Sequence, residues 1–447
     1  MATLLAQLSG KDSPSARRAA LRLGELKKVR ARAPLESALN SPDVGLRVSA
    51  ASALGELARA ESRSALEMLL ADADWRVRAQ AAYALSRIHD RRSTLSLAEL
   101  LTRDASALVR NACALALGRI GDPRAVPALD RALDDESERV RREAILAIER
   151  SSDPRAAEKV RRFLRDPSRS VRIAATVVIG IRRDPQGADS LLTFLRRSDS
   201  WERPALLVAL GRIGTPACGD ALAEAAGDPM RWVRVCALHG LAEMRSPRVT
   251  DVAIAHLADP SWAVRGAAAL ALGQSGDRAG AAFLVPLLRD ANPWVRRGAV
   301  YGLGQLGATD AISKIRDALD DRDPEVRLAA IWSLGHLRDA VSAPRLIRLL
   351  SVTRPRDSPA RPILAEGDGS VRLVSDAESR LFDGLVEAVG AFASGNPRSR
   401  ARRALEAAKR SLSTAELDRP ARLPTPLGSG QGARALRALF DATDDPR

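Results

Sequence analysis

The side chains best suited to catalysis or metal binding in this 447-residue chain are four histidines and three cysteines. They are scattered. The patterns His-x-x-His, Cys-x-x-Cys and Gly-x-Ser-x-Gly do not occur, and neither does a Walker-type phosphate-binding loop. We therefore expect a protein that is not an enzyme and that needs neither a metal nor another cofactor. The odd number of cysteines argues against a disulfide framework, so a reducing, cytoplasmic location is expected.

The most regular polar feature is an arginine that recurs in steps of 30, 31 and 32 residues, followed by seven steps of 31. These repeat arginines are Arg17, Arg47, Arg78, Arg110, Arg141, Arg172, Arg203, Arg234, Arg265, Arg296 and Arg327. Such a series could bind phosphates. Aspartates at the same step, such as Asp166 and Asp259, offer carboxylate partners instead. We expect the arginines to bind these carboxylates and helix-end carbonyl groups of adjacent repeats, and not a ligand.

The residues around each repeat arginine predict a helix, here called helix A. Small residues stand three and six positions after the arginine, and Leu or Ile follows directly, as in Ala81, Ala84 and Leu85. This spacing marks one face of a helix, and small side chains let a neighbouring helix approach closely. A second apolar pair, such as Leu97 and Leu101, lies 19 and 23 positions after the arginine and predicts helix B.

Start and stop signals accompany both helices. Asp-Pro, Thr-Pro or Ser-Pro pairs such as Asp122-Pro123 precede helix B. The pairs expected to begin helix A are Asp166-Pro167, Asp228-Pro229, Asp259-Pro260, Asn292-Pro293 and Asp323-Pro324. An N-cap side chain accepts a hydrogen bond from an unpaired backbone N–H, and proline at the first helical position has no N–H to lose. Helix A is expected to end where a residue adopts positive φ, at Gly121, Gly214, Gly276 and Gly307.

A single helix pair has an apolar face that it cannot bury alone, and stacked neighbours bury it. We therefore predict an all-α fold, a right-handed α-solenoid of about 11–12 helix pairs. The repeated phrase, well seen in Asp290–Asp320, resembles the short HEAT-like repeat of the type named after phycobilin lyase subunits. This resemblance covers about residues 10–350 and implies the fold. Proteins with such repeats include scaffolds, lyase chaperones, DNA-repair glycosylases and a di-iron hydroxylase. No histidine here precedes a glutamate, as the hydroxylase branch requires.

Four segments are expected. The repeats occupy residues 1–350, and a Pro-rich insertion follows at 351–375, where prolines exclude a helix. Residues 376–412 would form a degenerate terminal repeat, and 413–447 a linker with a short helix. That helix would cap the last repeat, and docking elsewhere is the alternative. No apolar run is long enough to span a membrane, and the first residues do not resemble a signal peptide, so neither membrane insertion nor export is expected.

The net charge of +15 raises the question of nucleic acid. Much of this excess lies near the ends, in residues 1–32 and 397–447. Residues 139–183 form a further basic cluster with thirteen basic and five acidic residues. The candidate anion-binding residues in it are Arg155, Lys159, Arg161, Arg162, Arg165 and Arg169. A solvated outer face is the alternative.

Aromatic residues gather at two positions of helix A. Five tryptophans lie two or three positions before a repeat arginine, in the first turn, and Tyr301 and Trp332 lie five positions after one. Interface hot spots favour such residues, whereas packing between successive turns is the alternative. The candidate partner-binding residues are Trp201, Trp232, Trp262, Trp294, Tyr301 and Trp332.

Together these features predict a scaffold that binds other proteins without chemistry. The partner would lie along an inner face formed by helix B, or along the edge with the tryptophans. A nucleic-acid-binding solenoid that uses the basic cluster is one alternative. A bilin lyase or its chaperone, implied by the resemblance alone, is another.

Overall fold

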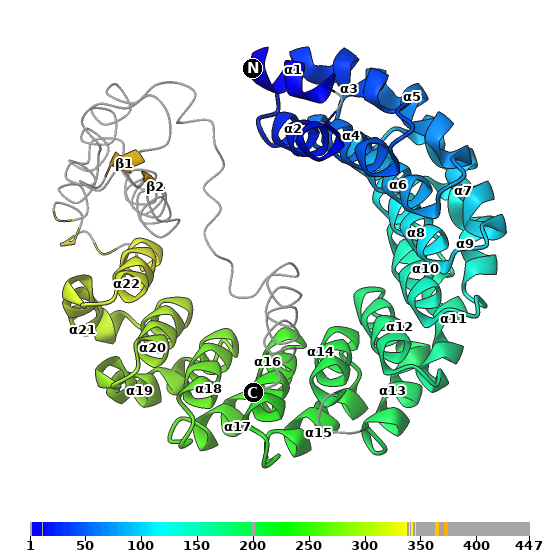
Figure 1. Ribbon diagram of the computed structural model, residues 1–447. Coiled ribbons are helices and arrows are strands. Elements are labelled where there is room, and N and C mark those ends of the chain that lie inside the picture. Colours follow the sequence, from blue (N-terminus) through cyan, green and yellow to red (C-terminus); the bar gives the residue numbers. More distant parts are fainter. Residues whose placement is uncertain are drawn as a thin grey trace, which may run out of the picture. The chain divides into compact units, whose positions relative to one another are not determined.

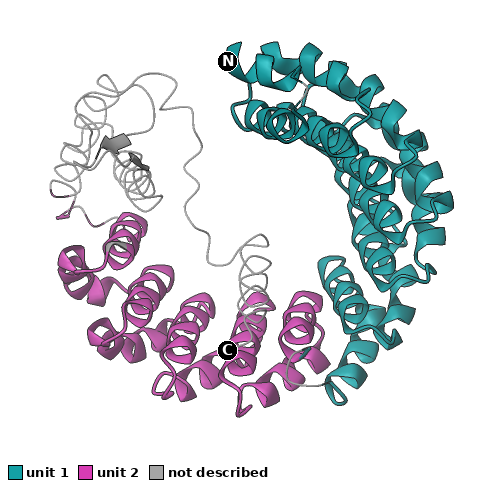
Figure 2. Ribbon diagram, viewed as in Figure 1, with its two compact units in different colours: residues 1–202 teal, residues 203–447 magenta. Residues whose placement is uncertain are grey.

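The computed structural model describes residues 2–10, 12–198, 202–337, 339, 341–342, 345, 363–365 and 371–373. The chain divides into two compact units, residues 1–202 and residues 203–447 (Figure 2). Within the described ranges, helices A and B alternate along both units, as the sequence predicted (Figure 1).

Unit 1 contains six helix pairs. Its helices A are α2 (Ser13–Glu25), α4 (Val44–Leu57), α6 (Trp75–Ile88), α8 (Ala107–Ile120), α10 (Glu138–Arg150) and α12 (Arg169–Ile181). Its helices B are α3 (Arg32–Ala38), α5 (Arg63–Met68), α7 (Thr94–Arg103), α9 (Val126–Ala132), α11 (Ala156–Val160) and α13 (Ala188–Leu195). A further helix, α1 (Ala2–Leu8), packs against α2 and α3, and the repeat pattern gave no sign of it.

Unit 2 continues the same alternation. Its helices A are α14 (Arg203–Ile213), α16 (Arg231–Glu243), α18 (Trp262–Gln274), α20 (Pro293–Gln305) and α22 (Pro324–His336). Its helices B are α15 (Pro216–Ala225), α17 (Val249–Ala255), α19 (Ala281–Leu284) and α21 (Ile312–Asp317). Short 3-10 turns precede or extend most helices B, for example Pro123–Ala125 before α9 and Leu69–Ala71 after α5. The predicted solenoid of helix pairs is thus confirmed.

Two short strands lie in the insertion that the sequence predicted as a loop. Strands β1 (Ile363–Ala365) and β2 (Val371–Leu373) pair antiparallel, with Ile363 opposite Leu373. The predicted degenerate repeat (376–412) and the predicted linker with its capping helix (413–447) lie outside the described residues.

Small residues bring consecutive helices A into close contact. A Cβ atom added at Gly273 would lie 2.4 Å from the Cα of Gly302, and one added at Gly211 would lie 2.5 Å from the Cα of Gly240. The helices B instead contribute larger buried side chains, such as Leu97. Because closer packing shortens the helix A layer, each unit curves with its helices A on the inside (Figure 1). The expectation that helix B forms the inner face is therefore wrong.

In most repeats the N-cap residue of helix A stands four positions before the repeat arginine, and this register corrects three of the predicted starts. Asn292 and Asp323 cap α20 and α22 as predicted, each accepting from the backbone N–H two residues on. The residues that cap α12, α16 and α18 are instead Ser168, Met230 and Ser261. The predicted caps Asp166, Asp228 and Asp259 lie two residues earlier, and each carboxylate accepts a hydrogen bond from the backbone N–H of the true N-cap residue. These aspartates also bind arginines of the preceding repeats.

Helix A ends at a residue with positive φ in ten repeats. Gly121, Gly214, Gly276 and Gly307 have φ between 65° and 76°, as predicted. In the other six repeats φ lies between 47° and 60°, although the residue is not glycine: Lys27, Ala58, His89, Ser152, Arg183 and Arg245. A left-handed conformation costs an L-residue roughly 1–2 kcal/mol, so these six positions are conformationally strained.

Exchange of glycine and alanine at this position should change stability in opposite directions. We expect Ala58→Gly to raise the free energy of unfolding by about 0.5 kcal/mol, because relief of strain exceeds the added entropy of the unfolded chain. We expect Gly276→Ala to lower it by about 1 kcal/mol. No heavy atom lies within 4 Å of a Cβ added at Gly276, so the lost stability would come from the strained backbone and not from a clash. Urea denaturation followed by circular dichroism measures the free energy of unfolding of both variants. A Gly276→Ala protein more stable than the parent would contradict the positive φ described for this residue.

Candidate binding surface

The repeat arginines form a ladder of ion pairs between neighbouring repeats. Among the described residues, ten of the eleven bind a carboxylate of the next repeat, and Arg172 uses Glu202 where the others use aspartate. In a typical rung, Nε and Nη2 of Arg265 donate to Asp290 at 2.8 and 3.0 Å. Its Nη1 donates to the carbonyl oxygens of Asp259 and Pro260 at 2.9 and 3.2 Å. The prediction that these arginines hold the stack together is confirmed.

The ion pairs of the ladder lower the pKa of several of its carboxyl groups. Hydrogen bonds from Arg296 lower the pKa of the Asp321 carboxyl, in spite of the opposing effect of burial. The same contact raises the pKa of the Arg296 guanidinium. Because each charge is bound by its partner, these groups serve the fold and are not suited to proton transfer.

Half of the predicted anion-binding cluster is bound within the protein. Three of its six residues pair with carboxylates: Lys159 with Asp130 and Asp153, Arg161 with Asp184, and Arg162 with Asp134. Arg155, Arg165 and Arg169 are exposed, and no described carboxylate binds their side chains. Three exposed guanidinium groups are a small footprint for nucleic acid, which is bound through many phosphate contacts.

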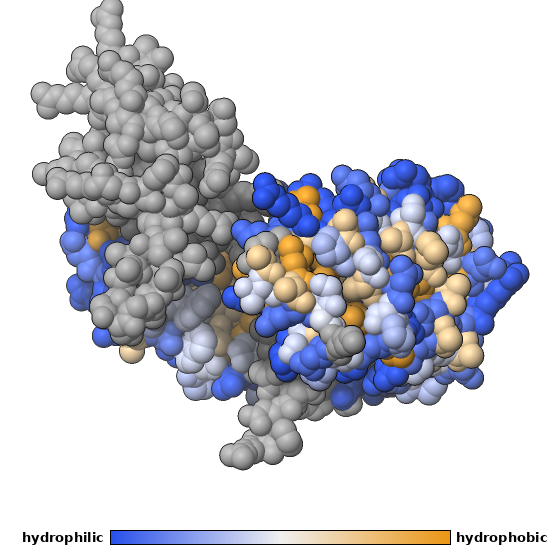
Figure 3. Space-filling model, turned by 45° about the horizontal axis from the view of Figure 1, so that its top comes forward, coloured by the Kyte–Doolittle hydropathy of each residue, from blue (hydrophilic) through white to orange (hydrophobic). Residues whose placement is uncertain are grey.

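Exposed apolar side chains interrupt the hydrophilic surface, as the space-filling view shows (Figure 3). Trp75, Trp262 and Trp294 are the tryptophans among them, with 43%, 44% and 57% of their area exposed. Packing between successive turns does not account for this exposure. Trp232 and Trp332 are half-buried, and Trp201 lies outside the described residues.

Unit 2 brings most of the predicted partner-binding residues onto four neighbouring helices A. This aromatic surface consists of Trp232 on α16, Trp262 on α18, Trp294 and Tyr301 on α20, and Trp332 and His336 on α22. The rings of Tyr301 and Trp332 stack with centroids 4.3 Å apart, and those of Trp332 and His336 lie 5.0 Å apart. Sequence reasoning missed His336, although its position four residues after Trp332 places it on the same helix face.

Guanidinium groups accompany the tryptophans of this surface. Arg297 lies 5.2 Å from the centroid of Trp294, and Arg231 lies 5.1 Å from that of Trp232. Both distances are typical of cation–π contacts. The arrangement can bury apolar side chains of a partner. Its guanidinium groups can donate hydrogen bonds to carboxylates or carbonyl groups of that partner. Burial lowers the pKa of the His239 imidazole, also on α16, to about 4. This side chain is therefore neutral near pH 7 and adds no positive charge to the surface.

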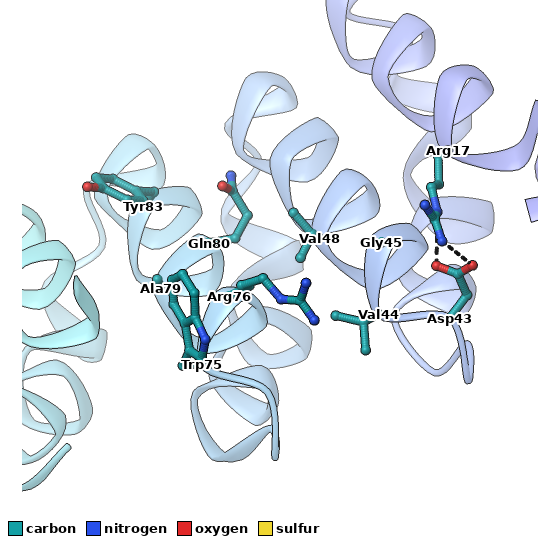
Figure 4. A pocket seen from close by; sticks show the side chains of 10 residues that line it. All are labelled: Arg17, Asp43, Val44, Gly45, Val48, Trp75, Arg76, Ala79, Gln80 and Tyr83. Atoms are coloured by element: carbon teal, nitrogen blue, oxygen red, sulfur yellow. Dashed lines mark hydrogen bonds and ion pairs between the residues drawn. The ribbon is translucent and has the colours of Figure 1, made fainter. Parts of the chain in front are cut away.

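Unit 1 has a groove of about 610 Å³ on its helix A layer. It is lined by Arg17 of α2, by Val44, Gly45 and Val48 of α4 with the preceding Asp43, and by Trp75, Arg76, Ala79, Gln80 and Tyr83 of α6 (Figure 4). Trp75 and Tyr83 of α6 therefore border a hollow, whereas Tyr301, Trp332 and His336 of unit 2 stack on one another.

In the part of the chain that the structure describes, no group of three or more His, Cys, Asp or Glu residues is placed to hold a metal ion. Burial raises the pKa of the Cys113 thiol, so this cysteine is a poor nucleophile. No helix in the described ranges has the length and apolar character needed to cross a bilayer.

The sequence matches the profile of HEAT repeats in seven overlapping stretches. They are residues 1–86, 66–149, 94–180, 131–211, 158–235, 219–290 and 281–359. No curated protein matches the chain.

Solved structures of importin-β have a similar fold. One, in an ammonium sulfate condition, is 14% identical with a TM-score of 0.55, and the match covers 100% of this chain and 67% of that one. Yeast importin-β is 13% identical with a TM-score of 0.52, and the match covers 89% and 68%. This chain thus spans about two thirds of their length. The CpcE–CpcF complex of phycocyanin lyase from Nostoc is 23% identical over 54% of this chain and 92% of that one, with a TM-score of 0.35.

Proposed function

Because the chain belongs to the HEAT-repeat family, we propose that it is a non-catalytic scaffold that binds a partner protein through the aromatic surface of unit 2. The observation that carries this proposal is the exposure of Trp262 and Trp294 in the first turns of consecutive helices A. An exposed tryptophan keeps a large apolar area in water, and a partner that covers it gains the free energy of burial.

The partner would bind as a helix or an extended segment laid across α16, α18, α20 and α22. Its apolar side chains would contact Trp262, Trp294 and the stacked pair of Tyr301 and Trp332. Its carboxylates or carbonyl groups would accept hydrogen bonds from guanidinium groups beside the tryptophans. Tryptophan and tyrosine lose little conformational entropy on binding, because each has only two side-chain torsions.

The other functions considered have less support. A nucleic-acid-binding solenoid would use a basic cluster of which half is already paired with carboxylates. A function as a bilin lyase or its chaperone would rest on likeness to the phycocyanin lyase complex. The TM-score of that match is too low to support the function. We place the scaffold in the cytoplasm, because Cys113 and Cys218 are free thiols, as a reducing compartment favours.

Site-specific photo-crosslinking tests the proposal. The photo-reactive residue p-benzoylphenylalanine would replace Trp332 in cells that naturally make the protein. The matched control position is Phe283 on α19, which is exposed but lies in the helix B layer. We expect a discrete crosslinked protein from position 332 and at least tenfold less from position 283. The pair Trp262→Ala and Trp294→Ala should reduce the crosslink at least tenfold. Equal crosslinking from positions 332 and 283 would contradict the proposal.

A further inference from the structure

At one end of the groove of unit 1, α4 lacks a side chain and the Arg17 guanidinium takes its place. Gly45 stands two positions before the repeat arginine of α4, where α16 and α20 carry Trp232 and Trp294. A Cβ added at Gly45 would lie 2.4 Å from Nε of Arg17. The Arg17 guanidinium therefore lies directly over the first turn of α4. Beyond it, the surface between α4 and α6 is hollowed as far as Trp75 (Figure 4).

The interior of the groove is apolar. Val44 and Val48 come from α4, and Trp75 and Ala79 come from α6. A volume of about 610 Å³ lies within the range of sites that bind small ligands or single anchoring side chains. The groove is thus large enough to receive an aromatic or branched aliphatic side chain with part of its backbone.

The rim of the groove presents hydrogen-bond donors with positive charge. Arg17 binds Asp43 and Arg76 binds Asp74, in both cases through Nε and Nη2. The two guanidinium side chains are 45% and 56% exposed, whereas the carboxylates are only 16% and 20% exposed. The negative ends of both pairs therefore point inward, and the positive ends face a ligand.

The Arg17 guanidinium borders the groove. Its Nε and Nη2 bind the Asp43 carboxylate, and its Nη1 lies 2.9 Å from the Cβ position of Gly45.

We infer that this groove binds a short acidic segment of a partner protein. An aromatic or aliphatic side chain of the segment enters the groove against Trp75, and carboxylates beside it bind Arg17 and Arg76. Gln80 and Tyr83, further along α6, offer hydrogen bonds to the segment's backbone. The site lies on unit 1 and stands independently of the function proposed for unit 2.

A designed peptide tests this chemistry on the full chain. The probe is a fluorescein-labelled peptide of twelve residues with one phenylalanine among aspartates and glutamates, followed by fluorescence anisotropy. We expect saturable binding at 50 mM salt that weakens at least tenfold at 500 mM salt. A peptide with serine for phenylalanine should bind at least tenfold more weakly, and one with lysine for every acidic residue should not bind. Equal binding of the lysine peptide would overturn the inference.

Variants locate the binding. Trp75→Ala and Val48→Glu should each weaken the probe at least tenfold. Trp262→Ala, at the same helix position and with the same exposure in unit 2, should change it less than twofold. Circular dichroism and thermal unfolding check that each variant is folded. If folded Trp75→Ala and Val48→Glu both bind like the parent, the groove is not the site. Binding that appears only in a chain shortened after residue 431 would assign the groove to residues 432–447 of this chain, and would overturn the partner proposal.

Discussion

Replacing Gly273 by valine is expected to lower the free energy of unfolding by about 3 kcal/mol, because the added side chain has no space. The Cβ alone would lie 2.4 Å from the Cα of Gly302, so the backbones of α18 and α20 would have to separate. Separation would loosen the whole contact between the two helices, whose small residues Ala268 and Ala271 are buried there. The cost therefore exceeds that of one strained side chain.

Chemical denaturation followed by circular dichroism measures this loss. The matched control is Gln274→Val, one residue further along α18 at a half-buried position. It should change the free energy of unfolding by less than about 0.5 kcal/mol. A Gly273→Val protein that unfolds at the denaturant concentration of the parent would show that the helix A layer tolerates wider spacing.

Replacing Arg296 by leucine should cost about 3 kcal/mol, because it leaves a partly buried carboxylate and two carbonyl groups without their donor. The Arg296 side chain is 8% exposed and donates to Asp321 at 2.7 Å through both Nε and Nη2. Its Nη1 donates to the carbonyl oxygens of Asp290 and Ala291 at 3.0 and 3.2 Å. Leucine can fill part of the volume but can replace none of these bonds.

Two further variants separate this effect from a general loss of charge. Arg322→Leu removes an exposed arginine of the neighbouring turn and should change the free energy of unfolding by less than about 0.5 kcal/mol. Adding Asp321→Asn to Arg296→Leu removes the unpaired charge, so the double variant should be more stable than Arg296→Leu alone. If Arg296→Leu and Arg322→Leu cost the same, the ladder contributes no more than surface charge.

Much of the fold follows from spacing along the chain. The ladder was predictable, because an aspartate 25 positions after an arginine, such as Asp290 after Arg265, reaches it from the next turn. The position of the N-cap relative to the repeat arginine could also have been predicted from the sequence. Asp259 stands six positions before Arg265, whereas Asn292 stands four before Arg296, and only the second spacing fits an N-cap. The prediction failed where it treated every Asp-Pro or Asn-Pro pair as one signal.

The curvature and the surface depend on packing between repeats, which spacing alone does not give. Helix A is the inner layer because glycines such as Gly273 and Gly302 meet across it. The stacking of Tyr301 on Trp332 depends on how far apart α20 and α22 lie. One end of the groove is formed where the Arg17 guanidinium lies over Gly45. Glycine occurs at this position in only one repeat, so a search for residues shared by all repeats does not find it.

The ladder determines which movements either unit can make. Each turn that carries a carboxylate is held twice: the Asp290 carboxylate binds Arg265, while its carbonyl oxygen accepts from Arg296. A line of turns that are each bound to two arginines resists lengthening. When a unit flexes, its helices A therefore rotate about this line, and the distances between them change most at their C-terminal ends. The tryptophans stand in the first turns, next to this pivot line. Their mutual distances are therefore preserved when a unit flexes, so the partner that we propose would meet a surface already in its binding arrangement.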